Sequence, residues 1–198
     1  MFKKILIANR GEIAVRIIRT CREMGLRTVA LYDAGDRESL HVRLADECVQ
    51  LPDHHAFMDV ERIIAIARDH SADAIHPGYG FLAENATFIH ACEAAGITFI
   101  GSPAEVIEAV NNKIGALDKA RAAGFPTVTY SRRSFSEDEF DALAADAAAI
   151  GYPLVVKSCR GGRGRGERLV NDPERLPEVV RRARAEAKAI YGRNELYI

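Results

Sequence analysis

Residues 4–19 decide the fold class, and they read Lys-Ile-Leu-Ile-Ala-Asn-Arg-Gly-Glu-Ile-Ala-Val-Arg-Ile-Ile-Arg. The apolar run through Ala8 is typical of a strand that is covered on both faces. The polar turn Asn9–Glu12 follows it and leads into a predicted helix that Gly25 ends. This helix carries four apolar residues at helical spacing: Ile13, Ile17, Cys21 and Met24. A buried strand that runs directly into an amphipathic helix indicates a βαβ unit.

The same alternation continues to residue 100. Strand-like segments are predicted at 27–32, 73–76 and 97–100, with a short apolar stretch at 48–51. Helices are predicted between them, at 38–46, 59–69 and 84–95. Strands separated by helices favour right-handed crossovers on a mainly parallel sheet. We therefore expect residues 1–100 to form one α/β domain with a Rossmann-like parallel sheet.

The pattern changes after residue 100. Residues 104–124 predict two consecutive helices without a strand between them, so that 101–125 reads as a helical linker. Residues 126–198 predict a small second α+β region. Its elements are a strand near 127–130, a helix from the capping box at Ser136 to Ile150, strands at 154–157 and 168–170, a helix from Pro173 to about Tyr191, and a strand at 195–198. About 70 residues give this region a thin core, and its final strand has no polar tail, which suggests a cut within a larger domain.

The composition argues against several classes of protein. The 198 residues are 48% hydrophobic and 28% charged, and the formal net charge is −1. A near-neutral chain is unlike a protein that coats nucleic acid or a membrane surface, and no apolar run is long enough for a signal peptide or a membrane span. Four widely spaced cysteines without a metal-binding pattern are typical of reduced thiols. We expect a cytoplasmic protein without nucleic-acid or membrane partners.

The Gly/Arg-rich segment after the strand at 154–157 is the most informative candidate site. Residues 157–168 hold five positive side chains against the single negative Glu167. Glycines let backbone N–H groups close on a polyphosphate, and a lysine on the preceding strand adds a point charge. It is not a Walker A loop, because Lys157 precedes the glycines. A solvated hairpin turn or a nonspecific RNA-contacting patch explains the same residues equally well.

Other candidates are weaker by themselves. The turn at Asn9–Glu12 has only one of the glycines of a dinucleotide fingerprint, which argues against nicotinamide binding. Its Arg10 and Glu12 could form a turn ion pair. His76 at a strand end is more typical of a hydrogen-bonded structural histidine than of a base. Tyr79, between two glycines, is a candidate for a ring exposed to a ligand.

Four motifs, in order and at the right spacing, resemble biotin carboxylase, an ATP-grasp enzyme of acetyl-CoA, propionyl-CoA and pyruvate carboxylases. They are residues 4–19, His41–Glu47, Ala74–Asn85 and Ile150–Lys157 with the glycine segment. The resemblance covers essentially the whole chain. It implies a pre-ATP-grasp N-terminal domain, a linker and the ATP-grasp lid, followed in the family by a large C-terminal domain.

The resemblance also implies roles for individual residues. Lys113 and Lys157 match lysines that contact the ATP phosphates, and Tyr79 and Gly80 match residues that line the biotin pocket. The lid loop over the nucleotide is matched by Gly161, Gly162, Gly164, Arg165 and Gly166. Arg19 and Glu23 lie on the helix through which family members form homodimers. The catalytic residues and the carboxylates for Mg²⁺ or Mn²⁺ belong to the C-terminal domain, so we assign no catalytic or metal residue here.

In the family, bicarbonate and Mg-ATP give carboxyphosphate, and its carbon dioxide is captured by biotin on a carrier protein that also serves a carboxyltransferase. By resemblance, this chain is expected to be an N-terminal fragment that is inactive alone and keeps a mobile loop at 160–166. The loop departs from the family pattern at Arg160, Arg163 and Glu167, and Asn111-Asn112 replaces a usual Gly-Asp. A diverged, non-catalytic module that binds a partner subunit is therefore the main alternative. Another ATP-grasp ligase or an NAD-dependent enzyme fits the motifs less well.

Overall fold

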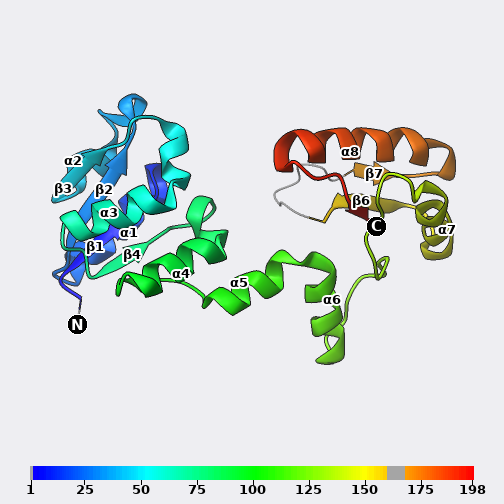
Figure 1. The fold of residues 1–198 in the computed structure, drawn as a ribbon, viewed down its shortest axis with the longest axis horizontal. Coiled ribbons are helices and arrows are strands. Elements are labelled where there is room, and N and C mark those ends of the chain that lie inside the picture. Colours follow the sequence, from blue (N-terminus) through cyan, green and yellow to red (C-terminus); the bar gives the residue numbers. More distant parts are fainter. Residues whose placement is uncertain (1, 160–167) are drawn as a thin grey trace. The chain divides into compact units, whose positions relative to one another are not determined.

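The computed structural model describes residues 2–159 and 168–198, and their contacts divide the chain into two units. The first unit is Met1–Glu108 and the second is Ala109–Ile198 (Figure 1). This division coincides with neither boundary predicted from the sequence, so the three-part organisation 1–100, 101–125 and 126–198 stays a prediction.

The first unit is built on a parallel sheet with the strand order β3-β2-β1-β4-β5. Every adjacent pair runs in the same direction. The order places β1 at the centre, with the chain winding to one side through β2 and β3 and to the other through β4 and β5. In chain order the strands are β1 (Lys4–Ile7), β2 (Arg27–Tyr32), β3 (Glu47–Gln50), β4 (Ala74–His76) and β5 (Thr98–Phe99).

Helices connect these strands, as the βαβ pattern predicts. They are α1 (Gly11–Glu23), α2 (Leu40–Leu44), α3 (Val60–Asp69) and α4 (Ala86–Ala94), with 3₁₀ turns η1 (Ala34–Asp36), η2 (His54–Met58) and η3 (Phe81–Glu84). Alternate residues of β1 serve two separate cores: Leu6 packs with α3 and α4 residues, and Ile5 and Ile7 pack with α1. A strand that is buried on both faces explains why its sequence is an unbroken apolar run.

The second unit contains a small antiparallel sheet of order β7-β6-β8, covered by α7 and α8. Its strands are β6 (Leu154–Ser158), β7 (Arg168–Val170) and β8 (Leu196–Tyr197). Its helices are α6 (Lys113–Ala122), α7 (Phe140–Ile150) and α8 (Leu176–Tyr191), with the turn η4 (Pro173–Arg175) before α8. Helix α5 (Ala104–Asn111) spans the division between the units. A parallel α/β domain and a small α+β unit confirm the predicted fold class.

Three details of the sequence interpretation are wrong. The segment 127–130 forms no strand, because no ladder of backbone hydrogen bonds joins it to a described strand. The helix predicted from Ser136 begins at Phe140, since the Ser136 amide donates to the Glu139 carboxylate at 2.9 Å and closes a separate turn. Met24 lies past the end of α1 and is 65% exposed, so it is not part of the apolar face.

Candidate functional site

The loop after β4 lies at the carboxyl end of the parallel sheet, where α/β folds place ligands. Gly78 and Gly80 both adopt positive φ, at +67° and +65°. Asn9, which follows β1 and is only 2% exposed, holds the loop through hydrogen bonds of its side chain. Its Nδ2 donates to the carbonyl of Pro77 at 2.7 Å and to that of Tyr79 at 2.9 Å. The glycines therefore supply the bend, and the asparagine fixes its position.

Tyr79 is presented to solvent by this loop, as predicted. The residue is 54% exposed, and its hydroxyl donates a hydrogen bond to the Glu12 carboxylate in the first turn of α1. The turn ion pair of Arg10 with Glu12, one reading that the sequence left open, is not the arrangement of these residues. Arg10 instead forms a two-point contact with Asp36, and this hydrogen-bonded pair holds the pKa of the Asp36 carboxyl below its usual range. Glu12 is thereby left to orient the tyrosine.

His76 has the structural role that its position predicts. It ends β4, and its Nδ1 accepts a hydrogen bond from the Gly78 amide at 3.0 Å. Burial lowers the pKa of the imidazole, because desolvation disfavours the charged form. A neutral ring is the form that can accept the amide proton, so His76 stabilises the start of the Tyr79 loop.

A cavity of about 890 Å³ in the second unit brings together both lysines singled out from the sequence. Lys113 is the first residue of α6, and Lys157 lies on β6. The rest of the wall is mainly apolar and includes Leu117, Ile150 and Tyr152. Two amines on the wall of an apolar hollow suit a ligand with an apolar body and an anionic group.

Burial sets the protonation state of the Cys159 thiol in the second unit. Burial raises the pKa of the Cys159 thiol to about 11, and the nearby Glu195 carboxylate adds to the effect. The positive charges of Lys113 and Arg184 oppose it. Cys159 therefore stays a neutral thiol, and all four cysteines are free, as expected. The glycine-loop residues Gly161, Gly162, Gly164, Arg165 and Gly166, and the predicted mobility of 160–166, lie outside the described residues.

The remaining candidates lie on α1, where Arg19 and Glu23 are both exposed. Asn9 and Asp36 were not assigned roles from the sequence. Their partners lie 68 and 26 residues away, and only the turn position of Asn9 could have drawn attention to it.

Two searches of the described residues found no candidate. No cluster of three or more His, Cys, Asp or Glu side chains in 2–159 and 168–198 could hold a metal ion. None of the helices in these ranges combines the length and the apolar character that crossing a bilayer requires.

Comparison with known proteins gives matches along the whole chain. Residues 1–107 match the model for the biotin carboxylase N-terminal domain, and residues 88–198 match that for the ATP-binding domain of the carbamoyl-phosphate synthase L chain. The biotin carboxylase of Pseudomonas aeruginosa is 46% identical over all of this chain, and that of Haemophilus influenzae is 43% identical. The chain spans only 44% and 45% of their lengths.

Solved structures give the same result. The biotin carboxylase domain of the Hydrogenobacter thermophilus 2-oxoglutarate carboxylase was solved as a dimer with MgADP, ADP and bicarbonate. It superimposes with a TM-score of 0.93 at 42% identity, over 100% of this chain and 44% of that one. A family model that covers more than half of the sequence, together with this agreement in fold, establishes that the chain belongs to the biotin carboxylase family.

Proposed function

We propose that this chain forms the N-terminal part of an ATP-dependent biotin carboxylase. In this proposal the second unit binds the triphosphate of ATP, and the loop after β4 contributes to the biotin pocket. The observation that carries the proposal is that Lys113 and Lys157, which are 44 positions apart in the sequence, line one cavity with apolar walls. The glycine segment Gly161–Gly166 begins three residues after the end of β6 in the sequence and is proposed to contact the phosphates.

The chemistry follows from these groups. ATP supplies the phosphoryl group that activates bicarbonate. The amines of Lys113 and Lys157 are proposed to hold the phosphates and to stabilise the charge that develops during transfer. The apolar wall formed by Leu117, Ile150 and Tyr152 suits the adenine. The described residues do not supply a carboxylate cluster for Mg²⁺, so we derive no step through the ion.

Tyr79 and Gly80 are proposed to contact biotin. The exposed Tyr79 ring, oriented by Glu12, offers a flat surface, and Gly80 lets a ligand approach the backbone without meeting a side chain. The proposed partners are a biotin carrier protein or domain, a carboxyltransferase, and a second copy that contacts the α1 residues Arg19 and Glu23. We also propose that the protein is cytoplasmic, in keeping with its free cysteines.

The test is calorimetric titration of the chain with Mg-ATP. The wild type and the matched control Lys188→Ala, which removes an exposed lysine of α8, are expected to bind alike. Lys157→Ala is expected to bind at least about tenfold more weakly, because charge-assisted contacts of a lysine with phosphate contribute about 1.5–3 kcal/mol. Equal affinity of the two lysine variants, or no binding by the folded wild type, would contradict the proposed nucleotide site.

A further inference from the structure

A second cavity in the Ala109–Ile198 unit has a different character. It measures about 550 Å³, a volume in the range of small-molecule pockets, and is lined by Arg121, by the segment Phe125–Tyr130 and by Arg132. We call it the Arg121–Arg132 cavity. It adjoins the lysine cavity through Val128–Tyr130, but neither Lys113 nor Lys157 lines it.

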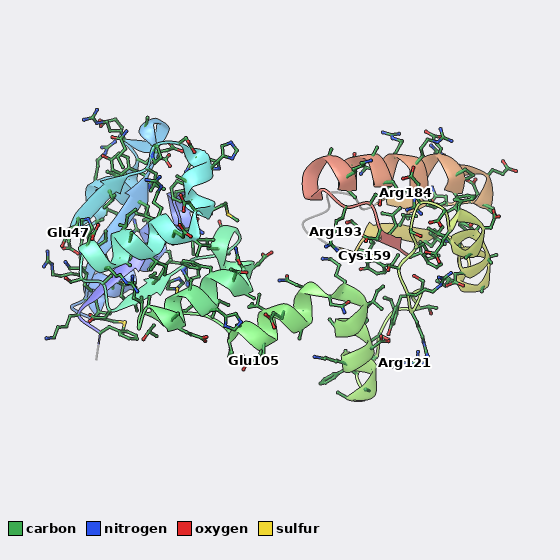
Figure 2. The ribbon with its side chains drawn as sticks, in the orientation of Figure 1. Glu47, Glu105, Arg121, Cys159, Arg184 and Arg193 are labelled. Carbon is green, nitrogen blue, oxygen red and sulfur yellow. The ribbon has the colours of Figure 1, made fainter. Side chains whose placement is uncertain are left out.

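The charge of this cavity is positive. Arg121, in the last turn of α6 (labelled in Figure 2), and Arg132 are both exposed, and neither side chain forms an ion pair or a hydrogen bond with a residue that the structure describes. None of the lining residues is acidic. Both arginines line the same cavity as Tyr130, one from α6 and the other from the chain that follows the 125–130 segment. The carboxylate of Asp118, which is not part of the lining, accepts the hydrogen bond of that hydroxyl at 2.7 Å.

The backbone of the same segment supplies further donors. The amides of Thr127, Val128 and Thr129 form no hydrogen bond with any described group, because this segment does not pair with a strand. Backbone N–H groups are obligatory donors and otherwise bind water. Two neighbouring side chains are strongly exposed and apolar: Phe125 at 67% and Val128 at 72%. Guanidinium and amide donors beside an apolar surface are the groups that recognise a phosphate ester.

We propose that the Arg121–Arg132 cavity binds a dianionic phosphate group through its two guanidinium groups. The charge of −2 matches the two arginines, and the free amides of the 127–129 segment are available for additional contacts. The site would take a small phosphorylated molecule whose body packs on Phe125. It is separate from the proposed nucleotide site, whose lysines it does not use.

The experiment is titration of the ¹⁵N-labelled chain with inorganic phosphate at constant ionic strength, followed by amide chemical shifts. In the wild type, saturable shifts are expected at residues 127–132. Arg121→Gln and Arg132→Gln are each expected to weaken this binding by roughly tenfold or more, since each removes a charge-assisted contact. Arg181→Gln, which removes an exposed arginine of α8, is the matched control and is expected to bind as the wild type does.

Lys157→Ala separates the two proposals. Retention of the shifts at 127–132 in this variant supports an independent site, whereas their loss would show that phosphate occupies the lysine cavity and would overturn the inference. Non-saturating shifts in the wild type would overturn it as well, as would equal weakening in Arg181→Gln and Arg121→Gln, because a diffuse positive field gives both results. All these variants alter exposed side chains or a cavity-lining lysine, and an unchanged amide spectrum elsewhere verifies the fold.

Discussion

Replacing Asn9 with alanine tests how the loop that presents Tyr79 is held. The side chain is 2% exposed and makes three hydrogen bonds. Its Nδ2 bonds to two carbonyls of the 76–80 loop, and its Oδ1 accepts from the Arg10 amide at 2.9 Å. The substitution leaves all three backbone groups without their hydrogen-bond partner, and it also removes the buried volume of the asparagine side-chain amide.

The expected loss of unfolding free energy follows from the burial of these three hydrogen bonds. A buried polar group that loses its partner costs about 1–3 kcal/mol. The Pro77 carbonyl bond is buried, and the other two bonds are partly buried, so the full penalty applies to one group and a reduced one to two. We expect Asn9→Ala to lower the free energy of unfolding of the first unit by about 3 kcal/mol, a large fraction of the 5–15 kcal/mol typical of a domain.

The assay is urea unfolding combined with hydrogen exchange of the β1 amides, which reports on the first unit separately from the second. Asn85→Ala is the matched control: it removes an asparagine that caps α4 through the Phe88 amide, and a loss of about 1 kcal/mol is expected. A loss for Asn9→Ala no larger than for the control would refute the reasoning.

A double-mutant cycle with Gly78 sharpens the same test. A Cβ at Gly78 would lie 2.7 Å from Asn9 Nδ2, and φ is +67°, so Gly78→Ala suffers from both steric overlap and backbone strain. In the Asn9→Ala background the overlap with Nδ2 and Cγ disappears, while the backbone strain and a 3.1 Å approach to the Cβ of residue 9 remain. We expect the double variant to lose less stability than the sum of the single losses, and strict additivity would count against the close approach.

Two further predictions concern single buried or networked charges. Glu47 accepts from Lys4 at 2.7 Å and from His70 and Arg27 at the same distance, which lowers the pKa of its carboxyl to about 2. A lowered pKa adds stability that is present above the usual value of 4.5 and is lost as the pH falls towards 2. We therefore expect the difference in unfolding free energy between the wild type and Glu47→Gln to shrink over that interval. Urea midpoints that differ equally at about pH 6 and at about pH 3 would contradict this expectation. Arg184 is 7% exposed and donates to the carbonyls of Phe135, Ser136 and Asn194. Arg184→Met is therefore expected to lower the free energy of unfolding of the second unit by about 3 kcal/mol. In the same urea titration, the exposed control Arg181→Met is expected to lower it by less than about 0.5 kcal/mol.

The elements that the sequence predicted correctly are those whose signal is local. The apolar run of β1, the periodicity of α1 and the glycine that ends it all act within a few residues, and β2 (Arg27–Tyr32) lies at its predicted bounds. The predicted strand at 127–130 failed for the opposite reason. Thr-Val-Thr-Tyr has the composition of a strand, but a strand needs a neighbour for its backbone hydrogen bonds, and that neighbour is a property of the tertiary fold.

The candidate functional residues show the same dependence on local sequence signals. Tyr79 and Lys157 could be singled out because each stands next to a recognisable turn, strand end or glycine run, whereas Lys113 was assigned through the family resemblance. The residues that position Tyr79 could not, because Asn9, Glu12 and Asp36 act through partners 26 to 70 positions away. Glu12 illustrates the consequence. Sequence proximity suggested Arg10 as its partner, yet Arg10 binds Asp36 after β2, and this arrangement leaves Glu12 to orient the Tyr79 hydroxyl. Three strand ends of one parallel sheet thus cooperate in presenting a single aromatic ring, and that cooperation depends on the strand order β2-β1-β4, which no local pattern encodes.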